Sequence, residues 1–444
     1  MSDDYKTDEL DPVIYKSQSK KAAIASTIGT TVEWYDYFVY GTASAMILPQ
    51  LFFPGSNPYI GTLESFATFF LGFLARPIGA AVFGHYGDKI GRKATLIITL
   101  LLMGFSTMLI GLMPTYGTIG FWAPLILIIL RVIQGIGVGG EWGGSVLLSM
   151  EWANKKKRGL MASWPQMGVS FGLFLSSVVF TLFINITGNH FNTWGWRIPF
   201  LLSSVLVVIG LVIRLSVMET PHFRKVQEEK KIARQPLIEV VKNNRREIIL
   251  STLLRLGENA PFYIFVTFVI SYGTEHLHMG RQFLVNATMA ASLVSLFTIP
   301  FFGYLSDIIG RKRMYMIGAI LTLLWAFPYY GLLNTSIPVL AIIAVIFSLI
   351  PHDMMYGSQG ALIAELFPAK VRYSGASLGY QLTSIIGGGP APLIATYLLH
   401  TYGGSVTISI YVIITAIISI IATALVKNRS KQVDLQYERR EISR

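Results

Sequence analysis

Twelve long apolar segments dominate the sequence and leave it few ways to fold. A helix needs about 20 apolar residues to cross the hydrocarbon core of a membrane. The segments cover residues 22–47, 61–84, 95–114, 120–149, 160–186, 196–217, 247–272, 284–305, 314–333, 337–358, 373–400 and 404–426. They are too long and too uniformly apolar for the alternating strands of a β-barrel. We therefore expect an all-α membrane protein with twelve transmembrane helices.

The composition excludes several classes of protein. Only 14% of the 444 residues are charged, whereas soluble domains average about 25%. The chain has no cysteine and its seven histidines are scattered, so we expect neither disulfides nor a metal site. The sequence shows no catalytic triad or nucleotide-binding loop, so we expect no enzyme activity and no cofactor.

The positions of lysine and arginine predict how the chain lies across the membrane. Cytoplasmic loops carry an excess of these residues. With the N-terminus placed inside, 31 of the 36 fall on the cytoplasmic side. The other five are Arg76, Arg131, Arg197, Arg255 and Arg281. We expect both termini to be cytoplasmic, and the net charge of +12 to reflect topology rather than nucleic-acid binding.

One long polar stretch divides the apolar segments into six and six. We expect a cytoplasmic segment at 1–21, a six-helix bundle at 22–217, a cytoplasmic linker at 218–246, a second six-helix bundle at 247–426 and a cytoplasmic tail at 427–444.

The two halves share a loop motif between their second and third helices. Residues 84–93 read GHYGDKIGRK and residues 303–313 read GYLSDIIGRKR. The matching positions are Gly84, Asp88, Gly91, Arg92 and Lys93 in the first copy and Gly303, Asp307, Gly310, Arg311 and Lys312 in the second. A further match, seven residues apart in each half, pairs Glu151 and Arg158 with Glu365 and Arg372. The repeat predicts two pseudo-symmetric six-helix bundles.

The motif also has a mechanical interpretation. Glycine permits the tight turn, and Asp88 can accept hydrogen bonds from backbone N–H groups or pair with an arginine. Such contacts would latch one conformation. Transporters built from two related halves rock them around a site near mid-membrane. We expect the motif residues, together with Glu141 near the inner end of the fourth helix, to form a cytoplasmic gate.

Together these features resemble the major facilitator superfamily, of which the repeated loop is a specific signature. Other segments resemble its metabolite:proton symporter family, and most of all the shikimate transporter branch. They are VEWYDYFVYG (32–41), RVIQGIGVGGEWGG (131–144), WGWRIPF (194–200) and RYSGASLGYQ (372–381). The resemblance covers almost the whole chain and implies proton-coupled uptake of a small metabolite. Members of the family carry shikimate, 2-oxoglutarate, citrate, proline or glycine betaine.

Ionisable residues inside predicted helices are costly and mark candidate functional sites. The candidates among them are Glu33, Asp36, Arg131, Glu141, Arg255, Glu258, His352 and Asp353. Asp36 lies about 22 Å into the first helix, and Arg131 about 14 Å into the fourth, so their depths permit contact. A carboxylate beside an arginine stays ionised, whereas an unpaired one in apolar surroundings favours its protonated form. A pair that forms in one state and breaks in another would bind and release a proton, so we expect Asp36 to carry the proton under the control of Arg131. Glu33 is the alternative carrier, and a permanent structural ion pair is the alternative role.

Arg255 and Glu258 have two interpretations. The offset of 219 residues between the loop copies places Arg255 opposite Asp36, so an organic anion between the halves could bind its guanidinium. Alternatively, Arg255 pairs with Glu258, one helical turn away. The adjacent residues His352 and Asp353 resemble a sequence in related transporters and indicate a proton relay.

Amide and aromatic side chains complete the predicted cavity. A polyhydroxylated ring would use both, although a tyrosine in a transmembrane helix is more often a packing residue, and a buried amide needs a partner. The candidates are Tyr35, Tyr40, Gln134, Trp164, Gln166, Tyr263, Tyr356, Gln359, Tyr380 and Gln381.

The sequence therefore predicts a proton-coupled symporter that imports a small organic acid, such as shikimate, by alternating access across a bacterial inner membrane. Its partners would be the substrate, protons and the lipid bilayer, and a monomer would suffice. Uptake of a zwitterion such as proline or betaine, or of 2-oxoglutarate or citrate, is the alternative. A membrane sensor with a transporter fold would need an added signalling domain.

Overall fold

The computed structural model describes residues 12–55, 57–90, 92–151, 157–216, 236–367 and 372–426. Within these ranges every regular element is a helix, and nine helices are long and apolar enough to cross a membrane. Two shorter apolar helices, Ile97–Leu112 and Arg197–Ile213, lie at the third and sixth predicted spans. α1 (Pro12–Met46) lies at the first. The predicted all-α architecture is confirmed.

The first half of the chain forms one bundle. Besides α1 it contains α2 (Leu48–Phe52), α3 (Pro58–Leu74), α4 (Arg76–Ile90), α5 (Arg92–Leu112), α6 (Tyr116–Ile119), α7 (Trp122–Val138), α8 (Trp142–Glu151), α9 (Arg158–Thr187) and α10 (Arg197–Ser216). The second predicted span is divided into α3 and α4, where Pro77 lacks a backbone N–H. The fourth is divided into α7 and α8 within its run of glycines.

Close packing explains part of that glycine run. A Cβ at Gly135 would lie 2.1 Å from the carbonyl oxygen of Gly72 in α3. A Cβ at Gly79 in α4 would lie 1.9 Å from the carbonyl oxygen of Ile136. Only glycine permits these approaches, so α7 lies directly against α3 and α4.

The second half forms the other bundle. It contains α12 (Pro236–Asn243), α13 (Arg245–Leu254), α14 (Leu256–Tyr263), η5 (Ile264–Phe268), α15 (Val269–Ser271), η6 (Tyr272–His276), α16 (Arg281–Ile309), α17 (Arg311–Leu333), α18 (Pro338–Leu366), α19 (Arg372–Thr383), η8 (Ser384–Gly388), α20 (Ala391–Tyr402) and α21 (Val406–Leu425). Two predicted spans contain π-helical turns, η5 and η6 in the seventh and η8 in the eleventh.

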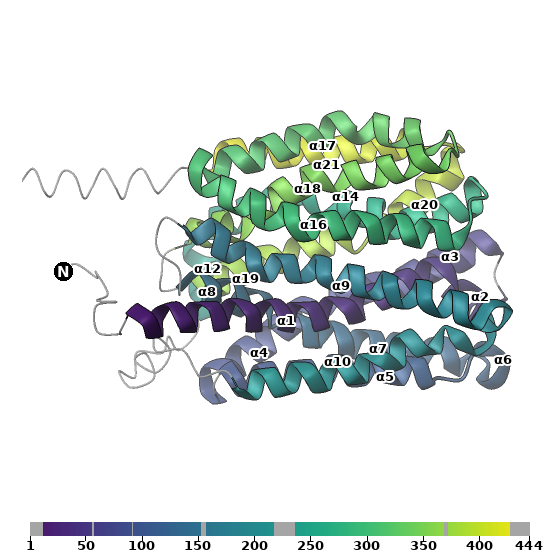
Figure 1. Ribbon diagram of the computed structural model, residues 1–444, viewed down its shortest axis with the longest axis horizontal. Helices are drawn as coiled ribbons and strands as arrows, with labels where there is room; N and C mark the ends of the chain where they lie inside the picture. The colour runs from purple at the N-terminus through teal and green to yellow at the C-terminus, as the bar shows by residue number, and fades with distance from the viewer. Residues whose placement is uncertain are drawn as a thin grey trace, which may run out of the picture.

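The two bundles lie side by side, with α9 of the first in extensive contact with α16 of the second (Figure 1). We call the end at which α4 and α16 finish the motif end, because both loop copies lie there, and the opposite end the far end. Aromatic side chains join the bundles between these ends. The ring centres of Phe38 and Phe262 are 6.0 Å apart, and those of Phe69 and Tyr263 are 5.7 Å apart.

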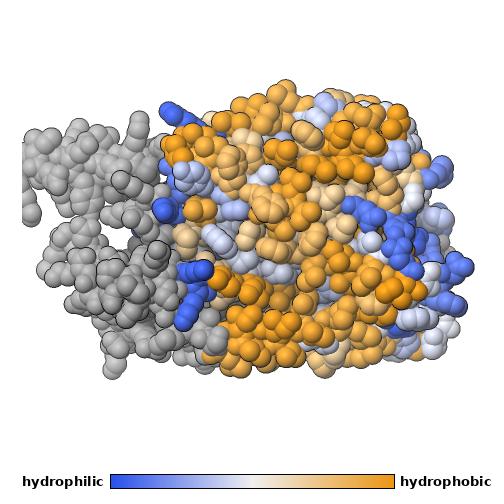
Figure 2. All heavy atoms as spheres, viewed as in Figure 1, coloured by the Kyte–Doolittle hydropathy of each residue, from blue (hydrophilic) through white to orange (hydrophobic). Residues whose placement is uncertain are grey.

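The visible surface is apolar over its middle and hydrophilic towards its two ends (Figure 2). Large apolar side chains such as Phe105, Phe297 and Phe301 are more than half exposed on the helices. A continuous apolar surface of this size is unusual for a protein in water and fits the hydrocarbon core of a bilayer.

Candidate functional site

A small cavity lies between the two bundles, with about 190 Å³ of empty space. Pockets for small molecules usually hold about 300–1,000 Å³, so this cavity is small for a substrate site. Its lining from the first half is Trp34 and Val169, and from the second Arg255, Glu258, Asn259, Phe262, Tyr263, His352 and Tyr356. The cavity thus brings together five residues predicted for the site, namely Arg255, Glu258, Tyr263, His352 and Tyr356.

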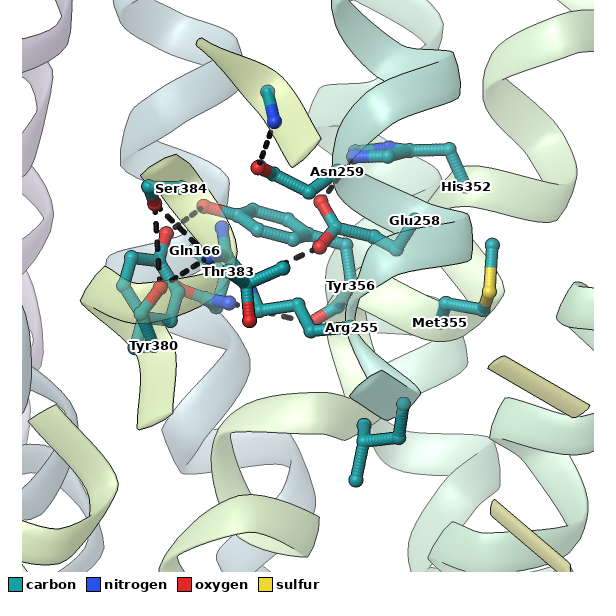
Figure 3. Close-up of polar contacts among 12 residues, drawn as sticks. Gln166, Arg255, Glu258, Asn259, His352, Met355, Tyr356, Tyr380, Thr383 and Ser384 are labelled. Atoms are coloured by element: carbon teal, nitrogen blue, oxygen red, sulfur yellow. Dashed lines mark hydrogen bonds and ion pairs between the residues drawn. The ribbon is translucent and has the colours of Figure 1, made fainter. Parts of the chain in front are cut away.

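Arg255 lies at the break between α13 and α14, and only 1% of it is exposed. Its Nη1 donates to the carbonyl oxygen of Tyr380 at 2.8 Å and to the Ser384 hydroxyl at 3.2 Å (Figure 3). Its Cζ lies 3.4 Å from the centre of the Tyr380 ring. Its Nε is 3.2 Å from Glu258 Oε2, so the predicted pairing of Arg255 with Glu258 describes this conformation.

Glu258 connects this arginine to a second polar group. Its Oε1 lies 3.2 Å from His352 Nε2, and His352 Nδ1 lies 2.9 Å from Asp353 Oδ1. The Thr298 hydroxyl donates to the other Asp353 oxygen at 2.5 Å. A neutral imidazole has one N–H, so its two contacts with carboxylate oxygens need one further proton, on the ring or on a carboxyl group. With that proton, Arg255 and the three acid–base residues carry no net charge.

Aromatic rings hold this polar network in place. The His352 ring stacks between Phe262 and Tyr356, at centre distances of 4.5 and 5.0 Å. Asn259, which sequence reasoning missed, accepts a hydrogen bond from the Gly388 N–H at 2.8 Å and ties α14 to η8. The sequence could have indicated Asn259 as a candidate, because it is an amide inside an apolar segment and a buried amide needs a partner.

Three other lining residues, Trp34, Val169 and Phe262, were also missed. They gave no signal in the sequence, because apolar residues occur throughout the predicted spans.

Among the described residues no ion pair joins Asp36 to Arg131 in this conformation, so the expected pair would have to form in another one. The buried Asp36 accepts a hydrogen bond from the Ser203 hydroxyl, and Arg131 Nη1 donates to Gln134 Oε1. Gln134 Nε2 then donates at 2.8 Å to the Thr107 hydroxyl, which lies beside Asp36. An amide and a hydroxyl therefore stand between the carboxylate and the guanidinium. Gln134, one turn further along α7, is the hydrogen-bond partner of Arg131 in this conformation.

Aromatic rings hold the Arg131 guanidinium. Its Cζ lies 4.1 Å from the centres of both the Tyr37 and Tyr40 rings. Within the described part of the chain, Arg131 Nε and Nη2 have no hydrogen-bond partner, and neither has Asp36 Oδ2. These free atoms are the ones that a direct pair would use after a rearrangement.

Glu33, the alternative proton carrier, has different surroundings. It is buried and interacts electrostatically with Arg76. The Arg76 Cζ lies 4.2 Å from the centre of the Tyr37 ring and 5.3 Å from that of Trp34. Glu33 therefore has an arginine as a neighbour, whereas the neighbours of Asp36 are hydroxyl groups.

Four residues predicted for the cavity lie outside it in this conformation. The Tyr35 hydroxyl donates at 2.8 Å to a carbonyl oxygen of α10, and the Tyr40 hydroxyl shares a 2.5 Å hydrogen bond with a threonine of α3. Gln134 is engaged as described above, and Trp164 is half-buried on α9. The sequence indicates how deep a residue lies in a span but not which way its helix face is turned.

Three of the remaining predicted residues, Gln166, Tyr380 and Gln381, lie outside the cavity lining and contact the opposite half of the chain. The rings of Trp142 and Tyr380 stack across the two halves at 3.9 Å, and Trp142 Nε1 donates to Gln166 Oε1 at 3.0 Å. Gln166 and Gln381 each donate to backbone of the opposite half, at 3.4 and 3.2 Å. Gln359 is buried, and its amide has no hydrogen-bond partner among the residues described.

The second copy of the loop motif latches the halves together at the motif end. The Asp307 carboxylate accepts hydrogen bonds from the N–H groups of Gly159 at 2.8 Å and Leu160 at 3.0 Å, in the first turn of α9. The partial positive charge of a helix N-terminus favours such an anion. Arg311 lies 3.2 Å from Asp307 and also forms an ion pair with Glu365.

Other motif residues support the same end. Lys312 Nζ donates to the last carbonyl groups around α21 at 2.8 and 2.6 Å, and Arg372 Nε donates to the Phe367 carbonyl at 3.3 Å. Gly310 has a φ of +98°, which favours glycine. Glu141 is buried and Arg158 half-buried. Six residues predicted for the gate lie outside the part of the chain whose side chains the structure describes, namely Gly84, Asp88, Gly91, Arg92, Lys93 and Glu151.

Replacing Asp307 by Asn is expected to loosen the motif end. Each lost hydrogen bond to a charged group contributes about 1.5–3 kcal/mol. Because the chain has no native cysteine, a single reporter cysteine at buried Ser163, which packs against Gly303, can be labelled with a maleimide. We expect labelling at least about tenfold faster with Asp307→Asn. Labelling no faster than in the reporter alone, or an equal rise with the control Glu64→Gln in α3, would contradict the latch.

The far end is closed as well. The ring centres of Tyr59 and His400 are 3.7 Å apart, joining α3 to α20. The Thr181 hydroxyl of α9 hydrogen bonds to Asn286 of α16 at 2.7 Å. With contacts between the halves at both ends and only a small cavity between them, the structure has an occluded conformation.

Comparison with known proteins identifies the family. Residues 21–248 match the family described as "Sugar (and other) transporter", and residues 262–443 match the "Major Facilitator Superfamily". The chain is 39% identical to the "Shikimate transporter" of Escherichia coli (strain K12) over 420 residues. These residues make up 94% of this chain and 96% of that relative. The chain belongs to the major facilitator superfamily. It is also 41% identical to the "Inner membrane metabolite transport protein YhjE" of the same strain, over 86% of this chain and 88% of the relative.

More distant similarities agree with this assignment. The chain is 31% identical to the "Proline/betaine transporter" of Escherichia coli (strain K12), over 95% of this chain and 86% of that relative. The fold resembles that of a D-xylose-proton symporter with a TM-score of 0.69 at 19% identity, over 91% and 96% of the two chains. The families and relatives are transporters, so this major facilitator protein is a transporter and not an enzyme.

Proposed function

We propose that this transporter is a symporter that takes up a small organic acid together with a proton, with shikimate as the first substrate to test. In this proposal the motif end and both termini face the bacterial cytoplasm, and the two bundles alternate around the cavity. The observation that carries the proposal is the buried Arg255 guanidinium, which lines a cavity between the bundles with a carboxylate beside it.

The charges around the cavity favour coupling to a proton. Arg255, Glu258, His352 and Asp353 sum to zero with the one proton that the two histidine contacts need. An organic anion entering this buried site would add a negative charge, which is costly in a low-dielectric environment unless it is compensated. A proton that enters with the anion removes that cost. Asp36 is our proposed carrier, and the His352–Asp353 pair is the proposed relay beside the cavity.

The lining suits a hydroxylated ring that bears a carboxylate. Arg255 offers the planar fork that binds carboxylates. Asn259 and His352 provide polar groups, while Trp34 and Tyr263 provide aromatic faces. The full-length similarity to a shikimate transporter supports the same substrate class.

A zwitterion is the second candidate, because aromatic rings and an acidic group share the cavity. Rings such as Trp34 and Phe262, together with Glu258, form the type of surface that binds quaternary ammonium groups. The similarity to a proline/betaine transporter agrees with this alternative.

The test is uptake of labelled shikimate into proteoliposomes, with and without an inward proton gradient. We expect accumulation that depends on the gradient and is lost when an uncoupler is added. A panel of 2-oxoglutarate, citrate, proline and betaine identifies the substrate class if shikimate is not taken up. Equal uptake with and without the gradient would contradict proton coupling.

A further inference from the structure

Glu258 is placed where the carboxylate of a substrate would bind. Its Oε2 lies 3.2 Å from Arg255 Nε, and both side chains are 1% exposed. We propose that Glu258 is a built-in competitor that occupies Arg255 in the empty transporter and is displaced by the substrate carboxylate. This inference rests on the proposed uptake of an organic acid and assigns the residue that sets the affinity for the substrate anion.

The contact between the two residues is close but not a well-formed hydrogen bond. Within the described part of the chain, Arg255 Nε and Glu258 Oε2 have no hydrogen-bond partner, although they are near each other. Arg255 Nη1, by contrast, donates hydrogen bonds to the Tyr380 carbonyl and to the Ser384 hydroxyl. A substrate carboxylate in the cavity can align with the guanidinium fork in a way that the tethered Glu258 does not. The resident carboxylate is therefore replaceable.

The displaced Glu258 already has a second partner. Its Oε1 contacts His352 Nε2 at 3.2 Å (Figure 3). The other ring nitrogen of His352, Nδ1, lies 2.9 Å from Asp353 Oδ1. The other ionisable groups around Glu258 are the phenols of Tyr315, Tyr356 and Tyr380. A small rotation of Glu258 away from Arg255 keeps its contact with the imidazole. Glu258 can thus leave the arginine without losing every polar contact.

This arrangement has a consequence for selectivity. A neutral ligand cannot replace a carboxylate on Arg255, because the guanidinium would then be buried beside a neutral group. An anion restores the ion pair that it breaks. Glu258 therefore lowers the affinity for every anion that must displace it, whereas a neutral analogue does not compete with it for Arg255.

The experiment measures binding of shikimate and its neutral methyl ester to the purified full-length protein, with Glu258→Gln as the variant. Removing the competitor leaves Arg255 without its carboxylate, so shikimate is expected to bind about tenfold to a hundredfold more tightly. The gain is expected to be absent for the methyl ester. Glu247→Gln, a carboxylate variant about three turns earlier in the same segment, is the matched control and is expected to leave both affinities unchanged.

The outcomes separate this inference from the proposed function. Unchanged or weaker shikimate binding by folded Glu258→Gln, with binding intact in the unaltered protein, overturns the competitor role alone. If neither protein binds shikimate, 2-oxoglutarate or citrate, the organic-acid function and the competitor role are both wrong. If Glu258→Gln does not fold, Glu258→Asp withdraws the carboxylate from Arg255 and is expected to give a smaller gain in the same direction. If the folded Glu258→Asp protein shows no gain in affinity for shikimate, the competitor role of Glu258 is also overturned.

Discussion

Asp36→Asn is expected to abolish accumulation of substrate against its gradient while exchange of substrate across the membrane continues. Asp36 is 1% exposed, and only one of its oxygens has a hydrogen-bond partner among the residues described. An asparagine keeps the shape of the side chain but cannot gain or lose a proton. Without that proton the two bundles can still carry substrate in both directions, but the proton gradient no longer drives the movement.

The measurement compares two assays on the same proteoliposomes. A proton gradient of one pH unit, coupled to one proton, supports about tenfold accumulation, and this ratio is expected to fall to about one in Asp36→Asn. Counterflow, in which labelled substrate exchanges for unlabelled substrate, is expected to remain within about twofold of the unaltered protein, because it needs no net proton movement.

Two variants keep the interpretation specific. Asp36→Glu retains a titratable group and is expected to restore part of the accumulation. Ser203→Ala removes only the hydroxyl that donates to Asp36, so it is expected to retain coupling. Accumulation by Asp36→Asn at the level of the unaltered protein would show that the proton is carried elsewhere. The next residues to test would then be Glu33, His352 and Asp353.

The arrangement of the helices was predictable because it depends on hydropathy and length. The apolar runs fixed the position of each span, and the repeated loop fixed the division into two bundles. The same repeat allowed the latch at Asp307 to be anticipated, because a carboxylate in the last turn of a helix, just before a tight turn, has few partners other than backbone N–H groups and arginine. The breaks in the second and fourth spans follow from Pro77 and from the glycines after Val138, which are visible in the sequence.

The lateral neighbours of each residue were not predictable in the same way. Asp36 and Arg131 have compatible depths, yet Gln134 and Thr107 lie between them. Depth along a helix follows from counting residues, whereas rotation about its axis depends on packing against every neighbouring helix. For the same reason the sequence did not show that Tyr263 lines the cavity whereas Tyr35 forms a hydrogen bond inside the first bundle.

The pair at Arg255 shows why two alternatives from a sequence need not exclude each other. Spacing by one helical turn favoured an ion pair with Glu258, and position within the repeat favoured an anion site. The structure has the ion pair on the wall of the cavity. The pair is therefore compatible with an anion site at Arg255 that the Glu258 carboxylate occupies when no substrate is bound.

Arg255→Ala is expected to reduce the affinity for an organic acid by at least about a hundredfold. The change removes the guanidinium that lines the cavity, and each hydrogen bond to a charged group contributes about 1.5–3 kcal/mol. It also leaves the buried Glu258 carboxylate facing the incoming anion, which adds repulsion. Binding of labelled shikimate to the purified protein, together with uptake into proteoliposomes, measures the loss.

A second variant separates lost recognition from lost folding. Arg255→Ala combined with Glu258→Gln removes both charges, so the buried unpaired carboxylate of the single variant is no longer present. The double variant is expected to recover thermal stability but not affinity for shikimate, because the anchor is still missing. Arg255→Lys keeps the charge without the planar fork and is expected to bind with intermediate affinity. Affinity for the organic acid that stays unchanged in a folded Arg255→Ala protein would place the carboxylate elsewhere, with the two free donors of buried Arg131 as the next site to test.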